Sequence, residues 1–338
     1  MDVSLDIPAD LEAWRRWSRK GRPLRAIRGA LRRPAPIEVV GEPEADLIVV
    51  VDAWHTSVRA ALVAPLAHLD AARTAVLGPP GVSAVVPWQA RVRTVAPADL
   101  GAALPGARAM LGSGHHLEPG GAAYALAATR GLPYLVAQHG LLTPKAPPLP
   151  PGAHLLAWSG SDGEFWASGR TDVRWTVTGS QLLADAATRP ATPLDPTGRP
   201  IYLGQLHGAE LPFASAAQAA EQFCLAHGAT YRPHPSERDR RSRRTHERWR
   251  DLGIEIASDA RPLRELDRPI VSVFSTGVLE AAAAGLPAYV HHPAPPAWLL
   301  GLWHRYDMHE YGTDPTPAPT PHPDPSRAIA RALIEAAR

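Results

Sequence analysis

Two hydroxyl side chains and a glycine mark one turn in the second half of the chain, directly after the run IVSVF. Ser275, Thr276 and Gly277 form this turn, and a helix-forming stretch containing Glu280 follows. Hydroxyls at a helix amino terminus lie beside unpaired backbone N–H groups and the positive end of the helix dipole, an arrangement that binds phosphate. Glu280, one turn further on, is placed to accept hydrogen bonds from a ribose. The alternative is that Ser275 or Thr276 is only a helix cap.

A histidine between two prolines marks a second turn, in the segment YRPHP. It follows a short apolar run and precedes a helix, so it should lie at the carboxyl edge of a sheet, where ligands of open α/β sheets bind. There His234 could donate a proton or hydrogen bond to a leaving phosphate, and Arg232 could add charge. The alternative is a surface histidine in a turn. By topology, Gln205 and His207 follow a neighbouring strand. If the phosphate belongs to a nucleotide, these two residues would face it.

The first half of the chain has its own candidate edge. Asp52 and His55 follow the run DLIVVVD, a continuous β-branched segment typical of a strand buried on both faces. By topology these two residues could contact an acceptor.

The elements that would position these residues alternate along the whole chain, a pattern that predicts parallel sheets wrapped by helices. In the first half, strands are expected at 46–52, 75–77, 108–111, 133–137, 154–159 and 174–178, with helices at 55–69 and 121–130. In the second half, strands are expected at 201–204, 230–232, 254–257, 270–274 and 288–291, with helices at 215–227 (capped by Ser215), 237–252, 278–284 and 326–337.

A run of prolines between residues 189 and 201 is typical of an interdomain linker. The predicted organisation is a basic leader (1–36), an N-terminal acceptor domain (37–184), a linker (185–200), a C-terminal donor domain (201–312), and a proline-rich strap with a final helix (313–338). From Pro315 to Pro325 every second residue is proline, which predicts an extended segment without hydrogen bonds. The fold class is α/β, with two Rossmann-like domains whose parallel sheets face a central cleft.

Composition narrows the class of protein. The 338 residues are 45% apolar and 20% charged, with one cysteine, which excludes an internal disulfide. No apolar stretch is long enough to span a membrane, and the first residues lack the pattern of a signal peptide, so a cytoplasmic location is expected. Residues 14–33 hold nine Lys or Arg and no acid. They predict either peripheral contact with an anionic membrane or polyanionic acceptor, or a solvated leader helix.

Two further classes of site are disfavoured. The pairs His115-His116 and His291-His292 lack the spacing of metal ligands, so no metal and no other cofactor is expected. The basic run from Arg232 to Arg250 contains acids, which indicates a solvated helix and not a nucleic-acid surface.

The order RPHP and then FSTGVLEAAAAGLP resembles the His-Pro and Ser/Thr motifs of bacterial polysialyltransferase-like enzymes and of CDP-glycerol glycerophosphotransferases, both in the GT-B glycosyltransferase superfamily. VTGS at 177–180 resembles the V-x-G-(S/N)-P end of the first domain in that superfamily, with Gln181 in place of the proline. QHG at 138–140 resembles the His-Gly loop of the glycerophosphotransferases. HLEPG at 116–120 is similar to the acid-acid-Gly motif of polysialyltransferases, with Pro119 in place of the second acid.

The resemblance implies a metal-independent, inverting transferase that moves a sugar or polyol phosphate from a CMP- or CDP-type donor to a glycan or polyol acceptor, in cell-surface glycan (capsule or teichoic acid) or secondary-metabolite assembly. His234, Ser275 and Thr276 would neutralise the donor phosphate. Glu118 or His139 would be the base on the acceptor hydroxyl, and the choice between them stays open. A UDP-sugar 2-epimerase is an alternative, although Ala281 follows Glu280 where that family has a second acid. A catalytically silent nucleotide-binding protein is another.

Overall fold

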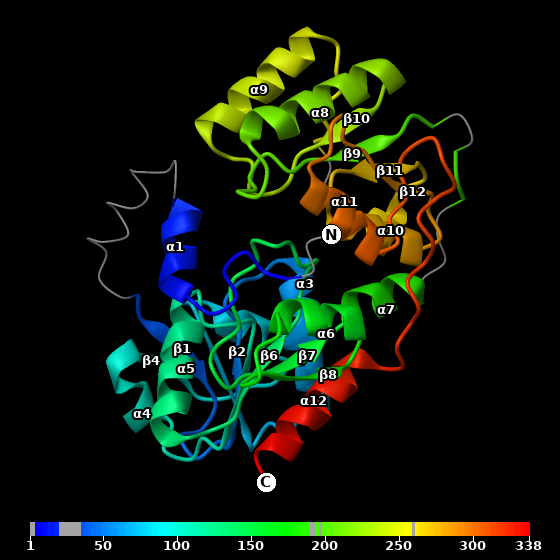
Figure 1. Cartoon of the computed structure of the whole chain (residues 1–338). Helices are drawn as coiled ribbons and strands as arrows, with labels where there is room; N and C mark the ends of the chain where they lie inside the picture. The colour runs from blue at the N-terminus through cyan, green and yellow to red at the C-terminus, as the bar shows by residue number, and fades with distance from the viewer. Residues whose placement is uncertain (1–3, 20–34, 189–192, 196–197, 259–260) are drawn as a thin grey trace. The chain divides into compact units, whose positions relative to one another are not determined.

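The computed structural model describes residues 4–19, 35–188, 193–195, 198–258 and 261–338, and these residues form two compact units. The N-terminal unit consists of Val3–Leu182 together with His322–Arg338, and the C-terminal unit consists of Leu183–Pro321 (Figure 1). Each unit is a sheet with helices packed on it. The predicted α/β class with two Rossmann-like sheets is therefore confirmed. Of the predicted basic leader (1–36), residues 1–3 and 20–34 lie outside the described residues.

In the described residues the N-terminal unit has an eight-stranded sheet in the order β4-β1-β3-β2-β5-β6-β7-β8. The strands are β1 (Ile37–Val40), β2 (Leu47–Val50), β3 (Thr74–Gly78), β4 (Val92–Val95), β5 (Ala109–Gly112), β6 (Tyr134–Ala137), β7 (His154–Ala157) and β8 (Arg174–Val177). From β3 to β8 the neighbours are parallel, as predicted. β1, which the sequence did not predict, pairs antiparallel with both β3 and β4, so this edge of the sheet is mixed.

Strand β2 lies at the centre of this sheet because every residue in it is apolar and fully buried. Successive side chains of a strand point to opposite faces. Ile48 therefore joins the core cluster beneath α5 and α6, whereas Val49 joins the cluster beneath η2 and α12. The sheet is covered on both faces, which is what a parallel sheet requires.

The helical elements of this unit include short segments between the strands. They are α1 (Leu11–Arg19), α3 (Thr56–Val58), η1 (Arg59–Val63), η2 (Ala64–His68), η3 (Val82–Val85), η4 (Pro97–Asp99), α4 (Leu100–Ala103), α5 (Glu118–Arg130), α6 (Gly160–Ala167) and α12 (Pro325–Ala336), and α7 (Gln181–Ala187) stands at the boundary of the units. The helix predicted over 55–69 is split into α, π and 3₁₀ segments. Pro65, which has no N–H to donate, stands where the 3₁₀ segment begins.

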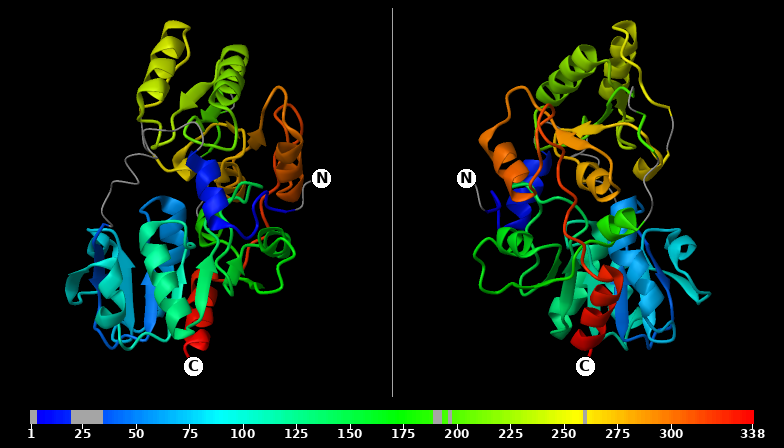
Figure 2. Two further views of the ribbon diagram at one scale, coloured as in Figure 1. Left: turned by 60° about the vertical axis from the view of Figure 1, so that its left-hand side comes forward. Right: turned by 90° about the vertical axis from the view of Figure 1, so that its right-hand side faces the viewer.

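The C-terminal helix α12 belongs to the N-terminal unit, where Figure 2 shows it in red. Leu333 and Ile329 are buried in the same cluster as Leu66 of η2. Gln181, which stands where the superfamily motif has proline, accepts a hydrogen bond from the Ser326 backbone N–H at 2.9 Å. Gly179 has φ +76°, and a Cβ there would lie 2.3 Å from the His322 Cβ, so only glycine lets the returning chain pass.

The C-terminal unit has a parallel four-stranded sheet in the order β10-β9-β11-β12, counted over the residues that the structure describes. The strands are β9 (Ile201–Leu203), β10 (Thr230–Arg232), β11 (Ile270–Ser272) and β12 (Ala288–Val290). The helices are α8 (Phe213–His227), α9 (Arg240–Asp251), η5 (Leu263–Glu265), α10 (Thr276–Ala283) and α11 (Ala297–Arg305).

Four details of this unit differ from the predictions. Residues 254–257 make only a single bridge, from Ile256 to Tyr231, and not a strand. Ser215 does not cap α8, which begins at Phe213 after Pro212; the Ser215 hydroxyl contacts His292 Nε2 at 2.9 Å instead. Helix α11 was not predicted. The strap is not free of hydrogen bonds, since Thr316 donates its N–H to the Ala288 carbonyl at 2.9 Å.

Both sheets reverse their strand order at one point. In the N-terminal unit the chain passes from β2 to β3 on one side and later to β5 on the other. In the C-terminal unit β10 lies on one side of β9 and β11 on the other. The carboxyl ends of the strands at such a switch point are where open α/β sheets bind ligands. The candidate residues are therefore sought at the ends of β2 and β5, and of β9 and β11.

Candidate functional site

At the switch point of the C-terminal unit, Gln205 joins the ends of β9 and β11. Its Oε1 accepts a hydrogen bond from the Phe274 backbone N–H at 2.9 Å and another from the Ser272 hydroxyl at 3.1 Å. The side chain was predicted to face the nucleotide. In the structure its oxygen holds the end of β11 and the segment that leads into the Ser275 turn. Gln205 therefore links the segment after β9 to the end of β11.

Helix α10 begins at this edge with the predicted Ser-Thr turn. Ser275 is the N-cap, and its Oγ accepts a hydrogen bond from the Gly277 N–H at 3.1 Å. Ser275 therefore caps the helix. Thr276 is the first residue of the helix, and Glu280 lies half-buried one turn later. Gly277 packs closely, because a Cβ there would lie 2.7 Å from the Leu203 Cδ1. Phosphate binding at this amino terminus remains a prediction.

After the neighbouring strands β9 and β10, two histidines stack face to face. The rings of His207, after β9, and His234, after β10, have centroids 3.7 Å apart and planes 14° apart. His234 is exposed, and its Nδ1 accepts a hydrogen bond from the Ser236 N–H at 3.1 Å. An accepting Nδ1 places the proton of a neutral imidazole on Nε2, so the ring has a defined donor.

Arg232 is not brought to this group. One of its terminal nitrogens donates to the carbonyl of Arg261. The guanidinium lines a polar pocket of about 180 Å³ whose other walls include Thr230, Glu255 and Arg268, and none of the predicted phosphate-binding residues. Neighbouring side chains of β10 leave on opposite faces, so Tyr231 enters the core while Arg232 turns away. The prediction that Arg232 supplies charge to the same phosphate as Ser275 gains no support from its position.

At the switch point of the N-terminal unit, Asp52 is tied into the fold. Its carboxylate accepts hydrogen bonds from the Ser113 hydroxyl at 2.8 Å and from the Gly120 N–H at 2.9 Å. Leu117, the N-cap of α5, has no side-chain acceptor, so Asp52 caps that helix from the neighbouring strand. Burial raises the pKa of Asp52 to about 6, against the two hydrogen bonds that lower it. Its predicted contact with an acceptor stays a prediction.

Imidazoles gather at the same edge. The rings of His55 and His139 have centroids 5.9 Å apart. Burial, together with the neighbouring His55 and His116, lowers the pKa of His139 to about 4, and burial likewise lowers the pKa of His116 to about 4. Both rings are therefore neutral at pH 7, the state in which an imidazole accepts a proton. Burial also lowers the pKa of His55. Glu118 is exposed on the first turn of α5.

Some residues that contact or support the candidate residues in the two units were not identified as candidates from the sequence. Trp14 of α1 packs edge-on against His116, with centroids 5.5 Å apart, and its Nε1 donates to the Lys145 carbonyl at 2.8 Å. Ser113 holds Asp52. In the C-terminal unit, Glu237 is buried and accepts a hydrogen bond from the Leu206 N–H, directly before His207. An acid inside a basic run gives no sequence signal of burial, whereas Ser113 directly follows a buried strand and could have been found by the rule that identified Asp52.

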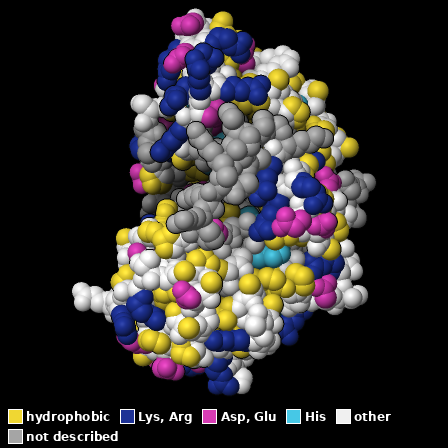
Figure 3. Space-filling view, turned by 90° about the vertical axis from the view of Figure 1, so that its left-hand side faces the viewer, with side chains coloured by type: hydrophobic (Ala, Val, Ile, Leu, Met, Phe, Trp, Pro, Cys, Tyr) yellow, Lys and Arg dark blue, Asp and Glu magenta, His cyan; other side chains and the backbone are white. Residues whose placement is uncertain are grey.

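Helix α9 presents an arginine-rich face, visible at the top of Figure 3. A groove beside it is lined by Arg240, Arg241, Arg244, Thr245 and Arg248. Arg248 pairs with Glu221 of α8, and Arg241 lies over the Phe213 ring, 3.7 Å from its centroid. These contacts tie two of the arginines to α8, and the interpretation of a solvated helix stays a prediction.

The described residues contain neither a cluster of metal ligands nor a helix that could span a membrane. No three His, Cys, Asp or Glu side chains there are arranged to hold a metal ion. Every helix in that part of the chain is too short or too polar to cross a bilayer.

Comparison with known proteins identifies no family. A scan against protein-family models found no match, and no curated protein matches the chain. Among solved structures, the chain is similar to a mutant of the O-GlcNAc transferase of Thermobaculum terrenum, with 14% identity and a TM-score of 0.44 over 89% of this chain. The chain spans 62% of that structure's length.

Proposed function

We propose that this protein is an inverting, metal-independent transferase that moves a sugar or polyol phosphate from a CMP- or CDP-type donor to a hydroxyl acceptor. One observation carries the proposal. At the switch point of the C-terminal sheet, the amino terminus of α10 and the stacked pair His207–His234 follow neighbouring parallel strands. The motif resemblance of RPHP and FSTG to polysialyltransferase-like and glycerophosphotransferase enzymes supports the same assignment of residues.

On the donor side, charge develops on the leaving phosphate as its bond to the transferred group breaks. The helix amino terminus offers N–H groups and a positive dipole, and the Nε2 proton of His234 offers a directed hydrogen bond. Donors fixed in advance stabilise such charge more than mobile ones do. Ser275 keeps the Gly277 N–H occupied in the absence of ligand, and a phosphate would compete for that donor.

On the acceptor side, we assign the base to His139 and not to Glu118. His139 is neutral at pH 7 and held among other imidazoles, whereas Glu118 is exposed on a helix turn. The base takes the proton of the acceptor hydroxyl while the oxygen forms its bond to the transferred group. The bond to the nucleotide phosphate breaks with its electron pair going to the phosphate, and the configuration at the reacting centre inverts.

The test begins with thermal shifts in the presence of CMP, CDP, UDP and GDP, because a ligand that binds only the folded state raises its stability. Purified protein is then given CMP- and CDP-linked donors with a panel of polyol and glycan acceptors. We expect release of the nucleotide that depends on the acceptor, and a loss of roughly 10²–10³-fold in kcat/KM for His234→Ala.

The matched control is His227→Ala, which removes an exposed imidazole from the carboxyl end of α8 in the same unit. This variant should react as the wild type does. Nucleotide binding without turnover on any acceptor would instead favour a silent binding protein, and absence of binding to all four nucleotides would refute the proposal.

A further inference from the structure

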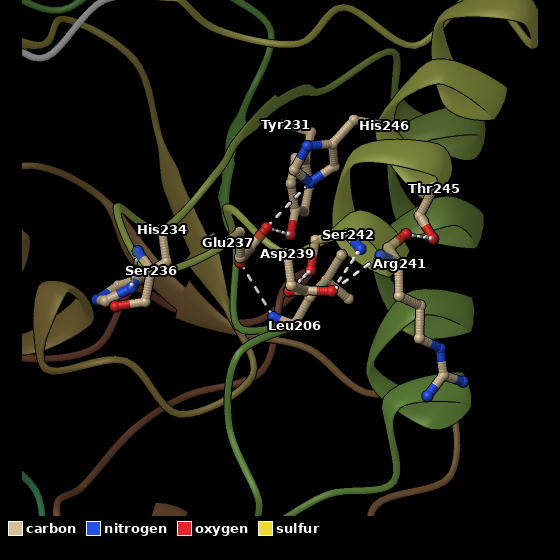
Figure 4. Close-up of polar contacts among 10 residues, drawn as sticks. All are labelled: Leu206, Tyr231, His234, Ser236, Glu237, Asp239, Arg241, Ser242, Thr245 and His246. Carbon is tan, nitrogen blue, oxygen red and sulfur yellow. Dashed lines mark hydrogen bonds and ion pairs between the residues drawn. The ribbon is translucent and has the colours of Figure 1, made fainter. Parts of the chain in front are cut away.

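The loops that carry His207 and His234 meet on one buried carboxylate. Glu237 Oε1 accepts a hydrogen bond from the Leu206 backbone N–H at 3.0 Å, directly before His207. Its Oε2 accepts from the Tyr231 hydroxyl at 2.9 Å and contacts His246 Nε2 at 3.0 Å. Figure 4 shows the Glu237 carboxylate between these three partners.

The same residue is tied to the His234 loop through the backbone. The Glu237 N–H donates to the His234 carbonyl at 2.9 Å, which closes a tight turn. Glu237 therefore binds the loop after β10 through its backbone N–H and the loop after β9 through its carboxylate. One anchor point is His234 itself and the other directly precedes His207, the two residues whose rings stack at 3.7 Å.

The position of the carboxylate is fixed from every side. The Glu237 side chain is fully buried, and Tyr231 is fully buried beneath it. At Gly204 a Cβ would lie 2.4 Å from the Tyr231 hydroxyl and 2.6 Å from Glu237 Oε1, so the end of β9 must be glycine to admit the pair. Burial of a charged group is costly unless hydrogen bonds compensate it, and three partners do so here.

We propose that Glu237 is the positioning residue of the donor site: by joining Leu206 to the His234 turn, it sets the stacking of His207 on His234 and hence the direction of the His234 donor. This inference rests on the proposed function for its consequence in nucleotide binding. The stacking itself is a property of the protein without ligand.

Three substitutions of Glu237 distinguish the effect of its side-chain length from the effect of its charge. Glu237→Gln keeps an oxygen at the distance of Leu206 N–H and loses the charge. Glu237→Asp keeps the charge and withdraws the oxygens by one methylene. Glu237→Met keeps the length and removes every acceptor. The control Tyr231→Phe removes one hydrogen bond of the same carboxylate and leaves the bond to Leu206 intact.

The first readout is NMR of ¹³C-labelled histidine rings in the protein without nucleotide. His207→Gln and His234→Gln assign the two resonances. Stacked rings shift each other's protons, so Glu237→Asp and Glu237→Met should move both resonances toward exposed values, whereas Glu237→Gln and Tyr231→Phe should leave them in place. If the Met variant does not fold, the Asp and Gln variants still decide the question.

The second readout is CMP and CDP affinity by calorimetry. Because a misdirected donor loses a hydrogen bond to a charged group, we expect roughly 10-fold weaker binding or more for Glu237→Asp, and wild-type affinity for Glu237→Gln and Tyr231→Phe. The inference is overturned if Asp behaves as wild type while Gln does not, or if the variants change the melting temperature with unchanged ring resonances. Failure of the wild type to bind any nucleotide would refute the proposed function, and the ring resonances would still judge the role of Glu237.

Discussion

The two switch points have the same topology and opposite electrostatics. At the end of β2 and β5, His116 and His139 are held neutral by burial, and Asp52 is occupied by Ser113 and Gly120. At the carboxyl edge of the second sheet, the exposed His234 follows β10, and a helix amino terminus follows β11. Neutral imidazoles have a nitrogen free to accept a proton from a hydroxyl, and an edge rich in N–H donors suits an anion. The difference teaches that burial, and not residue type, separates the two roles proposed for histidine.

The largest effect should come from removing the base. His139→Ala is expected to lower kcat by roughly 10²–10⁴-fold, the usual contribution of a general base, with CMP affinity unchanged. Glu118→Ala is the comparison, since it removes a carboxylate from the same edge. Steady-state kinetics with calorimetry distinguishes them. If Glu118→Ala loses the activity and His139→Ala retains it, the assignment is reversed.

The contrast in burial also predicts a dependence of stability on pH. His116 and His139 have pKa values of about 4 in the folded protein, below the 6.5 of an unfolded chain. The unfolded chain therefore binds more protons between these values, so their contribution is complete above pH 6.5 and is lost as the pH falls toward 4. The raised pKa of Asp52 acts in the opposite direction below about pH 6.

Urea unfolding at pH 7 and pH 5 tests this balance. From pH 7 to pH 5 the wild type should lose about 1–2 kcal/mol more unfolding free energy than His139→Gln, which has no group to protonate. Gln222→Ala, which removes an exposed side chain without a titratable group, should lose as much as the wild type. Equal losses in wild type and His139→Gln would show that the first edge is not desolvated in solution.

The smallest effect concerns the cap of α10. Ser275→Ala removes an acceptor for the Gly277 N–H and should cost about 0.5–2 kcal/mol of unfolding free energy, whereas Ser275→Gly should cost only a few tenths. If the hydroxyl also binds donor phosphate, both variants should weaken CMP binding alike. Calorimetry beside thermal unfolding separates the two contributions, and unchanged CMP affinity in both variants would leave Ser275 a cap alone.

The sequence predicted the elements whose patterns are local. The β-branched run at β2 and the Ser-Gly signals around α10 are read directly from neighbouring residues. The strand expected at 254–257 fails because apolar residues alone do not supply a ladder partner, and only Ile256 finds one. β1 was not predicted, since its antiparallel partners β3 and β4 lie far along the chain.

For the candidate residues, too, the sequence predicted what depends on local pattern and missed what depends on distant contacts. Topology placed Gln205, His207 and His234 at one edge, because the carboxyl ends of parallel strands coincide. It could not show that Gln205 bonds Phe274 or that Arg232 turns away, since such contacts depend on which face each side chain leaves. Glu237 was beyond prediction because its partners come from Leu206, Tyr231 and His246, at three separate positions of the chain.

The return of α12 to the N-terminal unit has a consequence for synthesis. Domains generally fold as units while the chain emerges from the ribosome, the first before the second. Here Leu66 and Leu111 are buried in one cluster with Leu333, which is translated after the whole C-terminal unit. During synthesis, the apolar face that α12 covers stays exposed until the last residues emerge. The C-terminal unit can therefore complete its folding before the N-terminal unit, whose two segments flank it in the sequence.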